Sequence, residues 1–358
     1  MSRVIVDSLR GNSASSDAIT LASDGTCTAN ITNNLSNRNI IINGAMQVAQ
    51  RATSSTSSGY QTLDRFPVFL NGCDENPTIS QADIASGTTP YTLGFRKSLK
   101  ITNGNQTTAP GGNDYIWIQN KIEAQDIANS GWNYTSSSSY ITLSFWVKSS
   151  VAQTFKGYIE TPNGTAQMYP FETGSLSANT WTKITKKIPG NSNLTFNNDN
   201  TEGFKFSIAP FIGVDKTSNS TTENVWAAYS GSGRMRDNTT TWFTTNDATF
   251  ELTGVQLEVG SVATDFEHRS YAQELQLCSR YYQIGGTIGG GYGSEDGYAR
   301  NGYIYAVPMR AAPTLSATNT SSGSIIAAAS SATGFYVTYG SLTGSSAGIF
   351  NFTAAAEL

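Results

Sequence analysis

Charged side chains are scarce in this sequence. Only 13% of its 358 residues are Asp, Glu, Lys or Arg, about half the usual share. His268 is the one histidine, so a histidine-ligated zinc site or a Ser–His–Asp triad has too few parts. No apolar run approaches the roughly 20 residues of a membrane helix. These shortages argue against the common hydrolytic sites and against membrane insertion.

Cysteine is equally sparse and the net charge is small. Cys27, Cys73 and Cys278 are odd in number and far apart, which argues against a disulfide framework. A net charge of −4 and a pI of about 5.1 argue against nucleic acid as a partner. The opening MSRVIVDSLRG lacks the apolar core of a signal peptide, so we expect synthesis in a cytoplasm.

Residues typical of β-sheet are abundant instead. The chain has 17 Tyr, 16 Phe and 34 Gly, with many Thr, Ser and Asn, which suits strands that expose hydroxyls and amides. Four runs alternate as half-buried strands do, and one predicted hairpin turn is Pro162-Asn163-Gly164. The runs are 141–147, 181–188, 204–208 and 250–259, the last with a bulge at Thr253-Gly254. We therefore predict an all-β protein whose residues 38–268 form a jelly-roll β-sandwich.

A helix is predicted next, over 269–283. Ser270 caps it, Gln273 completes a capping box, and Tyr271, Leu275 and Cys278 recur at helical spacing. Cys278 is expected to pack in the core. His268, just before the helix, is expected to hydrogen-bond the backbone.

The remaining segments are predicted as follows. Residues 1–37 form an extended N-terminal arm with strands at Val4–Val6 and Ile19–Leu21. A buried strand begins at Asn39 and runs through Ile42, and Asp64-Arg65 is a structural anchor. Residues 284–358 form a smaller β-sandwich that opens on a stretch, Gly285 to Gly293, too rich in glycine for a packed strand. Its strands are expected at 303–307, 335–339 and 349–352.

Three strings in this sequence resemble a known family. NRNIIINGAMQVAQR with GYQTLDRF, then ELTGVQLEVGSVATDFEHRSYAQELQLCSRYY, then VPMRAAPTLS with the final AAEL are similar to segments of structural proteins from tailed bacteriophages, especially phages of marine bacteria. They occur in the expected order between Asn37 and Leu358. The order SFWVKSS, TWTKIT and FELTGVQLEVG also resembles the jelly roll of carbohydrate-binding modules. Synthesis in a host cytoplasm followed by release in a virion would fit the polar surface.

The resemblance implies a virion appendage, such as a tail fibre or receptor-binding protein, that acts by multivalent contact and not by catalysis. It needs no cofactor. We expect a homotrimer that contacts a host surface polysaccharide and joins a tail adaptor, a nozzle or the capsid through its arm. The arm residues assigned to attachment are Val4, Ile5, Val6 and Leu9.

Flat aromatic rings beside amides suit carbohydrate contact. Five aromatics lie in polar, loop-like contexts and are our candidates: Trp132, Tyr134, Trp226, Tyr229 and Trp242. Packing at a sheet edge or at a subunit interface would explain the same residues. A capsid decoration or head fibre with a purely structural role therefore stays open as the alternative.

A polysaccharide depolymerase is the third reading, because carboxylates are numerous enough to supply a glycosidase pair. It is disfavoured, since no repeat of 20–30 residues indicates the β-helix usual in such tailspikes. Acidic loop residues such as Asp74, Glu75 and Asp215 lack the spacing of a calcium loop, so no metal ligand is assigned.

Overall fold

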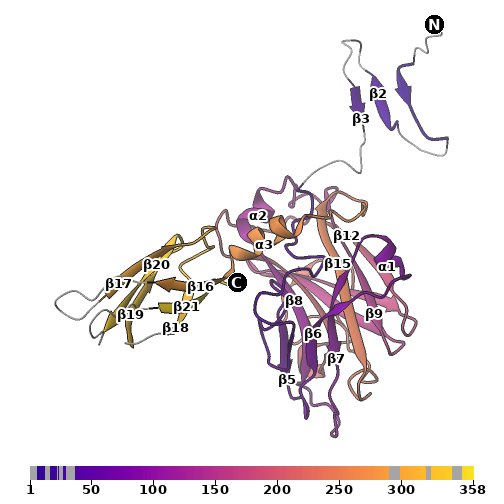
Figure 1. The fold of residues 1–358 in the computed structure, drawn as a ribbon. Coiled ribbons are helices and arrows are strands. Elements are labelled where there is room, and N and C mark those ends of the chain that lie inside the picture. The colour runs from indigo at the N-terminus through magenta and orange to yellow at the C-terminus, as the bar shows by residue number, and fades with distance from the viewer. Residues whose placement is uncertain are drawn as a thin grey trace.

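The structure, a computed structural model, describes residues 6–12, 17–21, 23, 27–29, 37–289, 299–319, 324–340 and 349–358. Two six-stranded antiparallel sheets form its main body, a jelly-roll β-sandwich (Figure 1). The first sheet has, in spatial order, β12 (Thr182–Pro189), β9 (Tyr140–Ser149), β15 (Thr249–Val259), β7 (Lys97–Thr102), β6 (Thr78–Asp83) and β4 (Ser54–Ser55). The second has β14 (Ala227–Ala228), β11 (Gln167–Ser175), β10 (Thr154–Thr161), β13 (Glu202–Ile212), β8 (Tyr115–Glu123) and β5 (Val68–Asn71).

Alternating apolar side chains close the core between the two sheets. Phe145 of β9 meets Phe206 of β13 with ring centroids 5.6 Å apart, and Phe206 stacks on Phe171 of β11. The bulge expected in β15 is present, because its register with β9 shifts between Thr253 and Gln256. The predicted hairpin turn joins β10 to β11, where Thr161 pairs with Gln167. The predicted all-β sandwich is therefore confirmed.

Short helices lie at the ends of the sandwich. They are α1 (Thr89–Thr92), α2 (Ala124–Ala128), the 3-10 turn η1 (Val214–Lys216) and α3 (Tyr271–Ser279). Ser270 and Gln273 form the predicted capping box of α3, and Cys278 is fully buried. Tyr271 is 56% exposed, so its predicted place on the apolar stripe is wrong. Among the described residues, no helix has the length and hydropathy needed to span a bilayer.

The buried strand predicted from Asn39 to Ile42 is wrong. This segment is buried but irregular, because the side-chain amide of Asn39 takes the place of a strand partner. Its Oδ1 accepts from the backbone N–H groups of Ile41 and Leu257, and its Nδ2 donates to the carbonyl of Val255. Asn43 then turns the chain at φ +61°, outside the extended region.

The C-terminal domain consists of two three-stranded sheets, coloured orange to yellow in Figure 1. They contain β16 (Tyr282–Gly289), β21 (Ile349–Ala355) and β18 (Thr314–Asn319), and β17 (Ala299–Ile304), β20 (Gly334–Gly340) and β19 (Ser324–Ser330). The expectation that the glycine-rich stretch forms no strand is wrong for Gly285 to Gly289, which belong to β16; residues 290–298 lie outside the described residues. Glycine is needed there, because a Cβ on Gly285 would lie 1.7 Å from the Phe352 ring. The predicted strands near 335 and 349 are present as β20 and β21, whereas β17 ends at Ile304, before most of the strand expected over 303–307.

Buried charges join this domain to the sandwich. Glu357 pairs with Arg65 and with Arg51, whose Nη2 lies 3.1 Å from Oε1 of Glu357. The guanidinium of Arg65 also stacks on Tyr281, 3.5 Å from the ring centroid. Arg65 is 1% exposed, which agrees with the structural anchor predicted for it. We call Glu357, Arg51 and Arg65 the Glu357 clamp.

The arm contains a small sheet of β1 (Ser8–Leu9), β2 (Ile19–Leu21) and β3 (Cys27–Ala29), which stands apart from the sandwich in Figure 1. The predicted strand at Ile19 is present. Val6 lies outside any strand, so the strand predicted there is wrong at this residue; Val4 and Ile5 lie outside the described residues. Val6 and Leu9 are 39% and 50% exposed.

Candidate functional site

Two of the five candidate aromatics are core residues. Trp242 is 0% exposed and donates from Nε1 to the carbonyl of Thr249. Trp132 is 3% exposed and lies beside Phe196, with ring centroids 6.2 Å apart. A ring that is covered on both faces cannot stack on a ligand, so these two prove to be packing residues and not platforms.

Two further candidates are half-buried and engaged with neighbours. Tyr134 meets Phe196 edge to face at 4.9 Å. The hydroxyl of Tyr229 accepts a hydrogen bond of 2.8 Å from Nε of Arg234. Their carbohydrate role stays a prediction, and neither residue lines the groove described next.

Trp226, the fifth candidate, stands at the edge of the second sheet beside the β10–β11 hairpin turn. It directly precedes β14, which pairs with the first residues of β11. Its Nε1 donates to the carbonyl of Pro189 at 2.7 Å, and its ring packs against Tyr169 at 5.3 Å. The indole is half-buried and thus held in one orientation.

The groove at Trp226 has a volume of about 460 Å³. Its lining residues are Thr165, Gln167, Asn193, Thr195, Trp226, Ala227 and Ala228. None of these described residues is charged. The Gln167 side-chain amide donates to the carbonyls of Thr165 and Ala166, which leaves its oxygen free to accept.

The side chains of Thr165, Asn193 and Thr195 have no hydrogen-bond partner among the described residues, and Asn193 and Thr195 are exposed. The groove therefore offers a fixed indole beside hydroxyls and amides that can both donate and accept. Sequence reasoning found Trp226 but missed these neighbours. Only the predicted turn before β11 hinted at them, because isolated polar loop residues carry no signal of their own.

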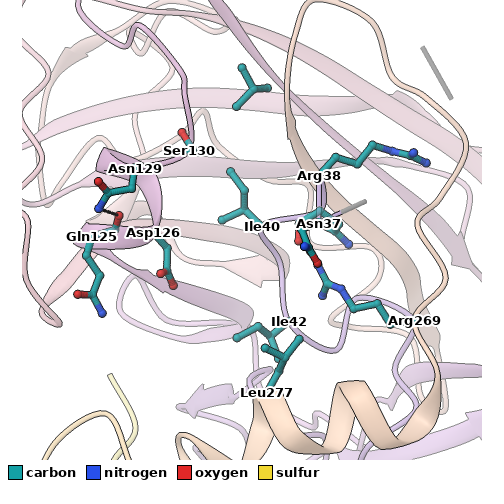
Figure 2. Close-up of a pocket in the computed structure, with 12 residues that line it drawn as sticks. Asn37, Arg38, Ile40, Ile42, Gln125, Asp126, Asn129, Ser130, Arg269 and Leu277 are labelled. Carbon is teal, nitrogen blue, oxygen red and sulfur yellow. Dashed lines mark hydrogen bonds between the residues drawn. The ribbon is translucent and has the colours of Figure 1, made fainter. Parts of the chain in front are cut away.

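A larger groove, of about 720 Å³, lies between the start of the sandwich, α2 and α3 (Figure 2). Ile40, Ile42 and Leu277 are apolar, and Asn129 bonds back to Gln125 within α2. Arg269 reaches the carbonyls of Asn39 and Ile41, so its charge already holds the buried segment in place. Without an aromatic ring, this groove suits a carbohydrate less well than the groove at Trp226.

His268 has structural partners on three sides. Nε2 of His268 lies 2.9 Å from the carbonyl oxygen of Leu93, which agrees with the backbone hydrogen bond expected for it. The imidazole packs against Phe95 and Phe266. In the part of the chain that the structure describes, no group of three His, Cys, Asp or Glu side chains is placed to hold a metal ion.

Comparisons with known proteins return structural similarity alone. No protein-family model matches the sequence, and no curated protein matches it. Tailspike protein 4 of bacteriophage CBA120 (enzymatically active domain) aligns over 62% of this chain and 22% of its own, with 10% identity and a TM-score of 0.33. The N-terminal cellulose-binding domain of Cellulomonas fimi β-1,4-glucanase C aligns over 61% of this chain and 99% of its own, with 8% identity and a TM-score of 0.29.

The tripod of the bacteriophage Tuc2009 baseplate aligns over 72% of this chain and 66% of its own, with 14% identity and a TM-score of 0.26. Structural neighbours thus include phage tailspike and baseplate proteins and carbohydrate-binding modules. At these TM-scores, none of them assigns a function to this chain.

Proposed function

We propose that this protein is a non-enzymatic appendage of a phage virion that binds host surface polysaccharide through the groove at Trp226. The observation that carries the proposal is the fixed, half-buried indole of Trp226 beside unpaired hydroxyl and amide groups. Sugar rings have apolar faces and hydroxyl edges, so an aromatic face with neutral donors and acceptors is complementary to them. The resemblance of the sequence to tailed-phage structural proteins supports the virion setting.

Attachment through the arm and assembly as a homotrimer complete the proposal. The exposed Val6 and Leu9 support an arm that pairs with another virion protein, such as a tail adaptor or the capsid. Three copies would raise the avidity of individually weak sugar sites.

A glycan array of bacterial surface polysaccharides tests the groove. The purified full chain is expected to bind at least one polysaccharide without releasing sugar fragments. Trp226→Ala and the exposed Asn193→Ala should each weaken that binding about tenfold, roughly 1.4 kcal/mol. Trp181→Ala is the matched control, because Trp181 is a half-buried tryptophan directly before β12, a strand of the other sheet.

Failure to bind any polysaccharide, or binding by both groove variants as tight as that of the unaltered chain, would overturn the proposal and favour a capsid decoration or head fibre. Release of fragments would instead favour a depolymerase.

A further inference from the structure

A smaller hollow, of about 200 Å³, lies on the outer face of the first sheet. Ser144 and Trp146 of β9 point outward here, because Leu143 and Phe145 face the core. Lys183 of β12 is the register partner of Trp146. The loops that follow α1 and β15 form the walls of the hollow. Leu93 of the first loop and Asp265 of the second are among the residues that line it.

Aromatic rings fix the two loops to each other. Phe95 from the first loop packs on Phe266 from the second at 4.9 Å and on His268 at 5.0 Å. The contact between His268 and the carbonyl of Leu93 joins the same loops. The walls of the hollow are therefore held in place without a ligand.

Gly254, in the β15 bulge, keeps the hollow open. Its φ is +62°, and a Cβ there would lie 2.7 Å from Cζ of Phe95 and 3.1 Å from Cδ1 of Trp146. Bulges often occur next to binding sites, where they redirect side chains.

Three side chains with polar groups at this hollow have no partner among the described residues. No hydrogen bond or ion pair is described for the side chains of Trp146, Lys183 or Asp265, and Lys183 and Asp265 are exposed. Together they supply an aromatic ring, a donor and an acceptor around one small space.

From this geometry we infer that the hollow binds the terminal sugar residue of a surface glycan. Its volume is below the roughly 300 Å³ of the smallest usual ligand pockets, so it suits one ring and not a chain. The inference rests on the proposed function, because both require a glycan ligand. It concerns a different site, which binds the end of the glycan chain.

The test titrates the full chain with methyl glycosides of glucose, galactose, mannose, rhamnose and N-acetylglucosamine, by calorimetry. At least one should bind, with affinity about tenfold weaker in Trp146→Ala and reduced in the exposed variants Lys183→Ala and Asp265→Asn. Trp117→Ala, a half-buried tryptophan of β8 in the other sheet, should bind as the unaltered chain does, and Trp226→Ala shows whether the groove binds the same glycosides.

No binding of any of the five glycosides would overturn the inference, as would unchanged binding by all three hollow variants. Loss of binding in Trp226→Ala alone would assign the sugar to the groove, leaving the proposed function intact while the inference fails. Polysaccharide binding that survives Trp226→Ala, together with glycoside binding that is lost in the hollow variants, would support the inference and overturn the proposed groove.

Discussion

Glu123, at the end of β8, binds the segment that follows α3 through its carboxylate. Its oxygens accept from Arg280 at 2.7 and 2.8 Å and from the hydroxyl of Tyr281 at 2.7 Å. Burial by itself raises the pKa of Glu123, but the hydrogen bonds from Arg280 and Tyr281 outweigh it and hold the pKa below its ordinary value. The charged form is therefore stabilised by folding.

This shift predicts how stability depends on pH. The pKa of Glu123 is lower in the folded chain than in the unfolded chain, so its contribution is fully present above the ordinary pKa and is lost as pH falls through the folded value. Glu123→Gln should therefore lose less stability than the unaltered chain between pH 6 and about pH 3. Urea denaturation at both pH values checks this, and an identical pH dependence in both proteins would contradict it.

At the scale of elements, the arm is held by contacts of its own. The hydrogen bonds described within residues 6–29 include those from the N–H of Ala18 to the carbonyl of Leu9 and from Leu21 to Asp7. A sheet of two- and three-residue strands has too little core to be stable alone. Under the proposed function, a virion partner provides the missing contacts.

Deletion of residues 1–36 should therefore leave the melting temperature of the sandwich unchanged while abolishing incorporation into particles. Differential scanning calorimetry and a particle-binding assay measure the two effects. A melting temperature several degrees lower, or normal incorporation, would contradict the division between arm and body.

For the whole molecule, the Glu357 clamp is one of the contacts that hold the C-terminal domain on the sandwich. Burial by itself lowers the pKa of Arg65, but Glu357 and Tyr281 outweigh it and raise the pKa. Lys121 and Tyr60 also donate to the carbonyl of Leu358, at 2.9 and 3.3 Å. The final residues thus contact the sandwich directly.

Glu357→Ala should lower the free energy of unfolding by about 3 to 5 kcal/mol, because it leaves the buried Arg65 without its carboxylate partner. Asp83→Ala removes an exposed ion pair with Lys97, in which the Asp83 side chain is 83% exposed. This change should alter the free energy of unfolding by about 0.5 kcal/mol or less. Guanidinium denaturation compares the two variants, and equal effects would contradict the role of the clamp.

The sequence by itself determined the elements whose signals are local. Alternation in β9 and β15, the bulge at Gly254, the turn before β11 and the Ser270 capping box depend on neighbouring residues, and each is present.

Only the tertiary structure decided which residues lie where those elements meet. Trp226 and Trp242 both stand in polar stretches, yet one borders a groove and the other is buried, because burial depends on segments distant in sequence. For the same reason Asn39 could not be recognised as the residue that replaces a strand partner, since its hydrogen bonds reach Val255 and Leu257. The groove at Trp226 combines residues from separate loops, and no local pattern predicts that combination.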